Sequence, residues 1–365
     1  MKNQKKVGFI LIMVFLLGFF QIVHSEDQEK ERVSALLQKW VDQDGKSPGV
    51  VLGIVDNNGQ RVYAHGFASK DGAPVTAETV FEIGSITKVF SALLIMEMAR
   101  RGELDPGKPV ADYLPAGLKL PRFQEQPILL EHLATHTSAL PRVQPNHFPA
   151  NILDPYADYT AAKMMEFLAG YELTRRPGAK YDYSNLGYGL LGYTLVLVAK
   201  KDFSALLDER VLRPLGLPDT MISVPEGKKK RRATPYGLFG HPVPYWSIPE
   251  IPACGALNST VPDLLSFLAF NLGLQISAND ALNQALIRLQ QPWSYADESG
   301  SAFDEWIWGH EKIKGRDYFW YNGGTGGFRS YIGFIPELKW GVAVLVNSVN
   351  VCDELALALA KAKLQ

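Results

Sequence analysis

The sequence FEIGSITK at residues 81–88 continues directly into VFSALLIMEMARRGEL at residues 89–104. Residues 86–99 are apolar almost all round, which predicts a helix buried on every side. Ser85 and Lys88 are three residues apart, so their side chains share one face of that helix. A serine hydroxyl attacks a carbonyl when a base removes its proton, and a lysine whose pKa is lowered by burial can be that base. The stretch therefore predicts a central helix that begins with a candidate nucleophile. The alternative is that Ser85 caps the helix and Lys88 points to solvent.

A second stretch, RPGAKYDYSN at residues 176–185, precedes another apolar helical pattern. Tyr183 and Asn185 are two residues apart in the turn before that helix, so both side chains can project from the same side. A tyrosine relays a proton if a neighbouring lysine favours its phenolate, and an asparagine can orient a substrate amide. The alternative is a tyrosine hydroxyl bonded to the loop, with Asn185 as a turn or capping residue.

A third stretch, WYNGGTGGF at residues 320–328, is rich in glycine next to a strand-like run. Glycines at the end of a strand let a ligand approach the backbone closely. A backbone N–H from such a strand could pair with that of Ser85 to hold an oxyanion. The alternative is a flexible loop.

Around these stretches the chain has its strand-like patterns at both ends. A helical period is followed by two strands joined through the turn signal DNNG at residues 56–59, and the C-terminal part repeats the combination with three strands and a closing helix. From Ser85 to about Leu289 the patterns are mainly helical. We therefore predict an α/β (α+β) fold, in which both chain ends build one antiparallel sheet with flanking helices and the helical middle is an insertion. The expected elements are residues 29–43 (helix), 50–55, 60–67, 318–321, 328–335 and 340–346 (strands), and 353–363 (helix).

In this order and spacing, the three stretches resemble the serine β-lactamase and penicillin-binding superfamily, specifically class C β-lactamases and their relatives. Those relatives include D-alanyl-D-alanine peptidases, D-amino-acid peptidases and carboxylesterases. Four further phrases support the resemblance, which covers nearly the whole mature chain: LATHTSALP at 133–141, PLGLPDT at 214–220, GALNST at 255–260 and GFRSYIGF at 327–334. The resemblance implies a β-lactamase/transpeptidase-like fold.

The resemblance also implies roles for individual residues. Ser85 would be the nucleophile, Lys88 its partner, and Tyr183 the group that shuttles a proton to the leaving group. Asn185 would bind the substrate amide, and the backbone N–H groups of Ser85 and Gly324 would form an oxyanion hole. A Ser-Asp-Asn second element occurs in other branches, whereas the Tyr-x-Asn form here points to class C relatives. The remaining candidates for substrate binding are Tyr321, Asn322, Gly323 and Gly324.

One departure concerns the third motif, which in the family usually opens with Lys or His, a small residue and Gly. Here the triplet is Tyr321-Asn322-Gly323. The missing cation would meet the substrate carboxylate, and a tyrosine supplies a hydrogen bond but no positive charge. The substitution weakens the β-lactam and peptide interpretations relative to an uncharged ester substrate.

The N-terminus predicts export. Three lysines in residues 1–6 precede an apolar run at 7–23, and polar residues follow from position 26. This pattern is typical of a signal peptide, here residues 1–25, which implies a periplasmic or secreted protein. The alternative is an uncleaved membrane anchor. We expect no later membrane span and a single catalytic module at 26–365, with residues 26–84 and 300–365 in the sheet region and 85–299 in the helical region.

The remaining sequence features give little evidence for a further function. A net charge of −1 provides no field that would gather nucleic acid, and no zinc pattern, phosphate loop or dinucleotide fingerprint occurs, so we expect no metal or other cofactor. His132 and His136 have metal-like spacing without a third ligand, and we expect structural histidines. The basic run at 228–232 is expected to be solvated surface. The segment 242–252, with Tyr245 and Trp246, would form a cleft wall or a rigid surface loop. Two inert buried thiols are expected at Cys254 and Cys352.

The predicted function is a cofactor-free acyl hydrolase, which we expect to act as a monomer on a small-molecule or cell-wall peptide substrate. A β-lactam, a D-amino-acyl peptide of the cell wall and a simple ester compete as substrates. We favour the β-lactam because the overall resemblance is to β-lactamases. The rate at which water attacks the acyl-enzyme separates a β-lactamase from a penicillin-binding protein, and that rate depends on fine placement. A non-catalytic penicillin-binding sensor is the alternative from another class.

Overall fold

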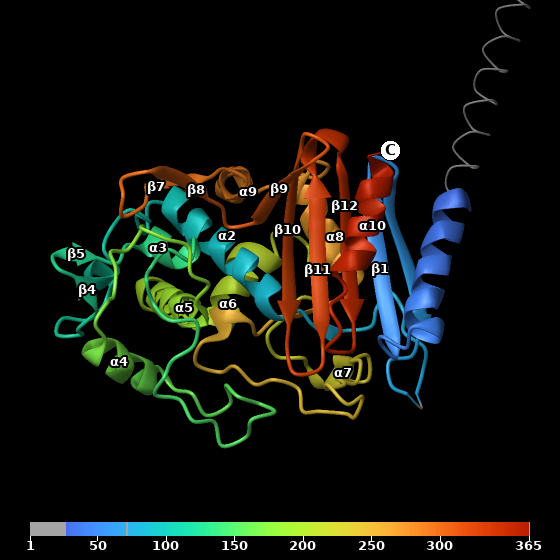
Figure 1. Ribbon diagram of the computed structural model, residues 1–365, viewed down its shortest axis with the longest axis horizontal. Coiled ribbons are helices and arrows are strands. Elements are labelled where there is room, and N and C mark those ends of the chain that lie inside the picture. The colour runs from blue at the N-terminus through green and yellow to red at the C-terminus, as the bar shows by residue number, and fades with distance from the viewer. Residues whose placement is uncertain (1–26, 71, 365) are drawn as a thin grey trace, which may run out of the picture.

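The computed structural model describes residues 27–70 and 72–364, so the predicted signal segment lies outside the described residues. A six-stranded antiparallel sheet has the order β2-β1-β12-β11-β10-β9. Strands from the two chain ends therefore lie side by side, as predicted (Figure 1). The strands are β1 (Gly49–Asp56), β2 (Gly59–Gly66), β9 (Gly309–Ile313), β10 (Arg316–Gly324), β11 (Arg329–Ile335) and β12 (Trp340–Val346).

The sheet separates two hydrophobic cores, because alternate side chains of its central strands point to opposite faces. In β1, Val51 and Val55 belong to the core shared with the helical region, whereas Leu52 and Ile54 belong to an outer core. The outer core is covered by the helical residues 27–38, which continue into the π-helical turn Lys39–Gln43, and by α10 (Asp353–Lys363). Figure 1 shows these two helices on the same side of the sheet.

The helical region packs against the other face of the sheet (Figure 1). Its helices are connected by loops, short strands and 3-10 turns. The elements are β3 (Phe81–Glu82), a 3-10 turn (Gly84–Ile86), α2 (Thr87–Arg100), a 3-10 turn (Val110–Tyr113), β4 (Arg122–Phe123), β5 (Gln126–Pro127), α3 (Leu130–Ala134), α4 (Ala161–Gly170), α5 (Asn185–Ala199), α6 (Phe203–Leu207), a π-helical turn (Asp208–Leu212), α7 (Glu226–Lys229), a 3-10 turn (Pro252–Cys254), β6 (Asn258–Ser259), α8 (Val261–Asn271), α9 (Asp280–Leu289), β7 (Trp293–Ala296) and β8 (Ala302–Glu305); a 3-10 turn (Pro336–Leu338) joins β11 to β12.

Helix α2 is the buried helix that the sequence predicts. Every residue from Thr87 to Met98 is buried, and the ring of Phe90 stacks on that of Phe267 in α8 with centroids 4.3 Å apart. The helix ends at Arg100, and Gly102 follows in the left-handed conformation that glycine adopts without strain. Because α2 is surrounded by protein, its first turn is fixed relative to both the sheet and the helices.

Three details differ from the sequence prediction. Strand β9 was missed because it is a charged edge strand, GHEKI, without a buried hydrophobic pattern. Strand β10 is longer than predicted and reaches Gly324. Ser85 lies in a 3-10 turn before α2 and not in the α-helix itself.

The basic run at 228–232 is solvated only in part, so that expectation is corrected. Lys229 and Lys230 are exposed, but Arg231 forms two hydrogen bonds with Asp219, at 3.0 and 2.7 Å. Arg232 is half-buried, with its guanidinium 3.4 Å from the ring centroid of Tyr245. These two arginines therefore hold the segment against the protein.

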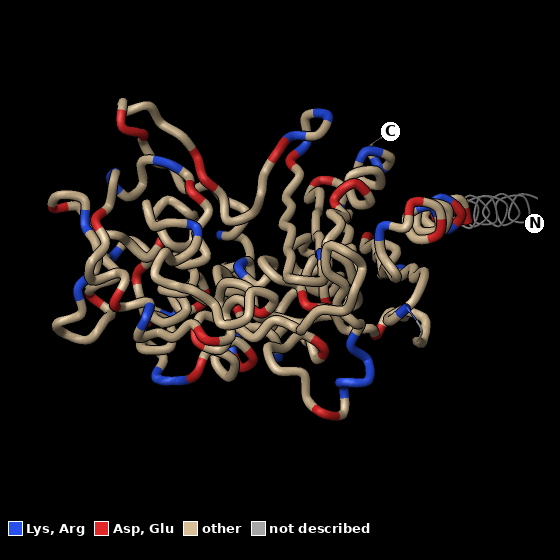
Figure 2. The backbone as a smooth tube through the Cα atoms, turned by 60° about the horizontal axis from the view of Figure 1, so that its bottom comes forward, with Lys and Arg blue, Asp and Glu red and all other residues tan. Residues whose placement is uncertain are grey.

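Figure 2 shows basic and acidic residues interspersed along the backbone. Among the described residues, no helix is both long enough and apolar enough to cross a membrane. Cys254 and Cys352 are buried and unpaired, and they lie in different cores.

The side chain of Asn347 joins the ends of three sheet segments. It is fully buried just after β12, where its Oδ1 accepts hydrogen bonds from Gly49 N at 2.8 Å and Ser47 Oγ at 3.1 Å. Its Nδ2 donates to the carbonyls of Phe67 at 3.3 Å and Ala68 at 3.1 Å. One amide therefore satisfies backbone groups from the ends of both β1 and β2.

We predict that Asn347→Leu lowers the free energy of unfolding by about 2–4 kcal/mol, because it leaves buried backbone groups unpaired. Urea denaturation followed by circular dichroism measures the change. As a control, Asn57→Ala in the exposed turn between β1 and β2 should change it by less than about 0.5 kcal/mol. Equal unfolding midpoints for the two variants would contradict this prediction.

Candidate active site

Ser85 is placed by a turn that only glycine permits. Gly84 has φ +50°, and a Cβ on it would lie 2.6 Å from the backbone nitrogen of Gly324. The turn therefore lies directly against the end of β10 and lifts Ser85 to the surface of the helical region. Ser85 is partly exposed, whereas its neighbours Gly84 and Ile86 are buried.

The hydroxyl of Ser85 contacts both predicted partners. Lys88 Nζ lies 3.2 Å from Ser85 Oγ, and the hydroxyl of Tyr183 donates to the same oxygen at 2.6 Å. The structure thus brings together a hydroxyl, an amine and a phenol from stretches about 100 residues apart. The alternative that Lys88 points to solvent is wrong, since this side chain is fully buried.

Lys88 has three hydrogen-bond acceptors. Besides Ser85 Oγ, its Nζ donates to Asn185 Oδ1 at 2.9 Å and to the carbonyl of Cys254 at 2.5 Å. An ammonium group has three N–H donors, so all of them are satisfied by neutral oxygens. This arrangement fixes Nζ beside the serine oxygen.

Tyr183 is the second residue before α5. Ser184 caps the helix, because its Oγ accepts a hydrogen bond from Gly187 N at 2.8 Å. Two cations lie over the Tyr183 ring, with Lys88 Nζ 4.8 Å and Arg142 Cζ 4.7 Å from its centroid. Positive charge so close to the ring stabilises negative charge on the phenolic oxygen. Arg142 follows the LATHTSALP phrase directly and carries no motif signal of its own, so its place beside Tyr183 could not be predicted.

His136 is a buried histidine that contacts the candidate site. Its Nδ1 accepts a hydrogen bond from Ser184 N at 3.0 Å, so the ring proton is on Nε2, which lies 3.5 Å from the hydroxyl of Tyr321. Its ring centroid is 4.3 Å from that of Tyr183. Burial, with help from the positive charges of Lys88 and Arg142, holds the pKa of His136 well below its usual value. The ring is therefore a neutral support for two tyrosines.

His132 does not join His136 in a metal site. Its Nδ1 accepts from Leu129 N at 3.1 Å, and burial lowers its pKa to about 4. In the part of the chain that the structure describes, no cluster of three His, Cys, Asp or Glu side chains has the arrangement of a metal site.

The third stretch places its backbone against Ser85 and one side chain against His136. A Cβ on Gly323 would lie 2.0 Å from Ile83 O and 2.9 Å from Ser85 N, so this strand lies tightly against the serine amide. Gly324 is in contact with Gly84, as an oxyanion hole shared by Ser85 and Gly324 requires. Tyr321 is buried on the inner face and contacts His136.

The side chain of Asn322 is not part of this group. It points to the opposite face of β10 and donates to Asp353 Oδ2 at 2.8 Å, at the start of α10. The alternation of side chains along a strand makes this unavoidable once Tyr321 faces inward. Only the backbone of Asn322 is then left to face a ligand at Ser85, so its predicted binding role does not extend to its side chain.

The aromatic segment at 242–252 lies beside the site. The ring of Trp246 packs edge-on against Tyr156 with centroids 5.5 Å apart, and the hydroxyl of Tyr156 accepts from Asn185 Nδ2 at 2.9 Å. This geometry favours the interpretation of the segment as one wall of the cleft.

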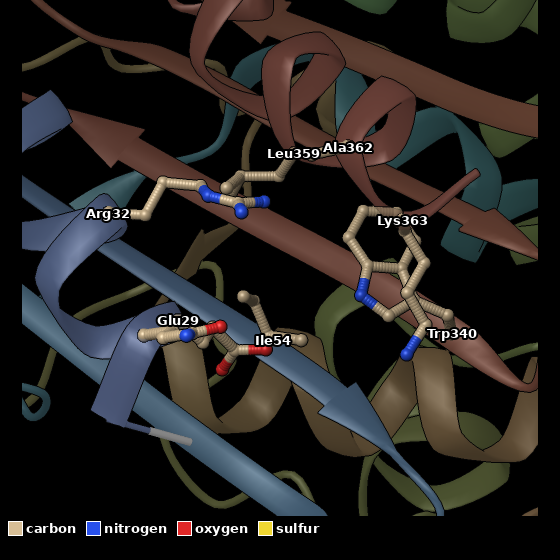
Figure 3. A pocket seen from close by; sticks show the side chains of 8 residues that line it. Glu29, Arg32, Ile54, Trp340, Leu359, Ala362 and Lys363 are labelled. Carbon is tan, nitrogen blue, oxygen red and sulfur yellow. The ribbon is translucent and has the colours of Figure 1, made fainter. Parts of the chain in front are cut away.

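Two cavities differ in their relation to Ser85. One of about 640 Å³ is lined by Tyr183 and Tyr321 and so opens beside the reactive side chains. A smaller one of about 220 Å³ lies on the outer face of the sheet, between the first helix and α10, where Arg32, Trp340 and Lys363 line it (Figure 3). Because Trp340 belongs to the outer core, the sheet separates this second cavity from Ser85.

Comparisons with known proteins identify relatives along nearly the whole chain. The family model described as Beta-lactamase matches residues 37–364. The D-alanyl-D-alanine-carboxypeptidase/endopeptidase AmpH of Escherichia coli K12 is 28% identical over 87% of this chain and 85% of that protein. A beta-lactamase of Providencia stuartii is also 28% identical, over 95% of this chain and 94% of its own length.

Solved structures share the fold. A class C beta-lactamase in complex with cefoxitin superposes with a TM-score of 0.80 at 23% identity, covering 93% of this chain and 99% of that one. A beta-lactamase/D-alanine carboxypeptidase from Yersinia pestis has a TM-score of 0.76 at 24% identity, covering 91% and 99%. The class C β-lactamase fold implied by the sequence resemblance is thus confirmed.

We predict that His136 stays neutral, with its proton on Nε2, throughout the pH range in which an ordinary histidine gains its second proton, because protonation of Nδ1 would break its bond with Ser184 N in a buried site. Nitrogen-15 NMR of labelled protein distinguishes the two ring nitrogens, and His136→Gln assigns the signals. An imidazolium forming with a midpoint near the ordinary histidine value of about 6.5 would contradict this.

Proposed function

The chain belongs to the β-lactamase family, and from that membership we propose that it is a serine hydrolase that forms an acyl-enzyme on Ser85 and cleaves a β-lactam or a related D-amino-acyl amide. The observation that carries the proposal is the contact of one oxygen with two proton-transfer groups. Ser85 Oγ lies 2.6 Å from the Tyr183 hydroxyl and 3.2 Å from Lys88 Nζ. Such a nucleophile paired with a base is the signature of covalent catalysis.

In the first half of the reaction, Ser85 Oγ attacks the substrate carbonyl carbon and a new C–O bond forms. The serine proton passes to Tyr183 in its phenolate form, which the ammonium group of Lys88 stabilises, and the N–H groups of Ser85 and Gly324 bind the oxyanion. Each such donor contributes about 3 kcal/mol. The bond to the leaving group then breaks, and Tyr183 supplies the proton that the departing nitrogen or oxygen needs.

In the second half, a water molecule attacks the acyl-enzyme. Tyr183 accepts the proton of that water and returns one to Ser85 Oγ, so the enzyme is restored and the acid is released. The net charge of the site is the same before and after one cycle. The proton taken from serine goes to the leaving group, and the proton taken from water goes back to serine.

Asn185 has a positioning role in this scheme. Its Oδ1 holds Lys88, and one N–H of its Nδ2 bonds the hydroxyl of Tyr156. A side-chain amide has two N–H donors, so the second remains available for a substrate carbonyl. Asn185 can therefore fix Lys88 and orient a substrate at the same time.

A carboxylesterase is the second candidate, and Tyr321 is the observation that favours it. The neutral ring of His136 lies at its hydroxyl, and burial keeps the pKa of Tyr321 well above its usual value. Both groups are therefore uncharged where a cation would meet a substrate carboxylate. A non-catalytic sensor of the same fold is disfavoured, because Ser85, Lys88 and Tyr183 are all in contact.

We predict that Ser85→Ala lowers turnover of a nitrocefin-type β-lactam or of p-nitrophenyl acetate at least about 10⁴-fold, because the nucleophile is lost. Tyr183→Phe should cost about 10²–10⁴-fold through loss of proton transfer. The matched control is Ser91→Ala on the same helix, whose hydroxyl donates to the carbonyls of Thr87 and Ala253, and it should leave turnover unchanged. Initial-rate kinetics measure all four proteins.

Labelling with a fluorescent penicillin separates the functions. A transient band with product indicates a β-lactamase, a stable band indicates a penicillin-binding protein, and no band with ester hydrolysis indicates an esterase. Equal rates for the wild type and Ser85→Ala on every substrate would refute the catalytic assignment.

We also predict that Tyr321→Lys raises kcat/KM for benzylpenicillin about tenfold relative to p-nitrophenyl acetate, because it restores a charge-assisted hydrogen bond to the carboxylate. Tyr321→Phe, which removes the hydroxyl without adding charge, is the matched control and should not favour the penicillin. A Tyr321→Lys enzyme whose preference equals that of the wild type would contradict the assigned role of this position.

A further inference from the structure

The cavity beside Tyr183 and Tyr321 has an aromatic lining. Its volume is about 640 Å³, and its walls come from the turn before α5, from β10, and from the segment between β8 and β9. Tyr181, Trp306 and Trp320 line it together with Tyr183 and Tyr321. Figure 1 shows the β7–β8 hairpin along the upper edge of the molecule and β9 beside β10.

Within the proposed function, on which this inference rests, the cavity lies on the leaving-group side of Ser85. In that scheme Tyr183 gives its proton to the departing atom, so the departing part of the substrate lies on the side of Tyr183. Tyr183 and Tyr321 both border the cavity. A leaving group larger than a few atoms would therefore extend into it.

The charges that line the cavity are acidic. Glu305 is the last residue of β8 and is half-buried, and among the described residues no side chain or N–H donates a hydrogen bond to its carboxyl. Burial raises its pKa to about 7. Asp304 is exposed beside it and accepts a hydrogen bond from Ser294 Oγ at 2.6 Å.

The histidine that lines this cavity already has an acidic partner. His310 lines the cavity, but its Nε2 is 2.8 Å from Asp317 Oδ1 and its ring stacks on Trp306 with centroids 4.1 Å apart. Arg142 lies over the ring of Tyr183 and is not one of the residues that line the cavity. A ligand that fills the cavity thus meets aromatic faces and a carboxyl group without a free cation within the described lining.

We infer that the cavity binds a leaving group that carries a cationic amine, and that Glu305 and Trp306 set this preference. An ammonium group is attracted by the faces of aromatic rings and by a carboxylate, and both interactions are stronger where water is partly excluded. A carboxylate on the same part of a substrate would be repelled. Within the proposed function, the favoured substrates are esters or amides whose alcohol or amine part bears an ammonium group.

Two esters with the same acyl group test the inference. The substrates are 3-(trimethylammonio)phenyl acetate and 3-carboxyphenyl acetate, measured at about pH 8.5 so that Glu305 is ionised. Each kcat/KM is divided by the rate of hydroxide-catalysed hydrolysis of that ester, which removes the difference in intrinsic reactivity. We expect the wild type to favour the cationic ester about tenfold. Glu305→Gln should bring the ratio close to one, and Glu305→Lys should invert it.

The matched control is Glu311→Gln, which removes a carboxylate from the exposed face of β9 outside the cavity lining and should leave the ratio unchanged. A wild type that favours the anionic ester, which would point to Arg142 as the dominant charge, overturns the inference. A ratio that is the same in the wild type and both Glu305 variants also overturns it.

A binding measurement separates failure of this inference from failure of the proposed function. Quenching of tryptophan fluorescence is titrated with phenyltrimethylammonium and with benzoate, neither of which can be hydrolysed. Tighter binding of the ammonium ion, weakened several-fold by Glu305→Gln and by Trp306→Leu, supports the cavity assignment even if no ester is cleaved through Ser85. Equal or tighter binding of benzoate overturns it even if Ser85 is the nucleophile.

Discussion

The structure depends on the close approach of two backbones, the turn at Gly84 and the end of β10. A Cβ at Gly84 or at Gly323 would lie within 3 Å of backbone atoms across this contact. The turn leads into α2, which is buried among the helices, and β10 belongs to the sheet. One contact thus joins the two parts of the molecule, and it places the amide of Ser85 beside the strand. Any larger residue at either glycine would separate the parts that the site needs together.

Lys88 is the second constraint, because a buried charge is stable only where its hydrogen bonds are complete. Its three acceptors come from the turn before α2, from the start of α5 and from the 3-10 turn Pro252–Cys254. These segments must therefore meet correctly for the chain to bury Lys88. The same geometry holds the amine against the nucleophile, so stability and reactivity depend on one set of contacts.

Around this charge, two buried tyrosines and a buried histidine are neutral. Burial raises the pKa of Tyr188 and of Tyr321 well above the usual value and lowers that of His136. Lys88 and Arg142 are then the charges next to the ring of Tyr183. A neutral aromatic surrounding strengthens their effect on Tyr183, because little else screens it. The cavity beyond Tyr183 has the opposite sign, through Glu305, so the electrostatic character changes along the path of a leaving group.

The sequence alone predicted the strands at both chain ends, apart from β9, and the buried helix α2, and it singled out Ser85, Lys88 and Tyr183 as candidates. These features are local: periodicity decides which face of a segment is buried, and the three-residue spacing of Ser85 and Lys88 aligns their side chains on one turn. The tertiary structure decided which groups join them. It turned Asn322 toward Asp353, placed His136 under Tyr183, laid Arg142 over its ring, added β9 at the sheet edge and brought Glu305 to the cavity. No spacing rule could give these contacts, because residues far apart in the chain meet only after the sheet and the helical region have packed together.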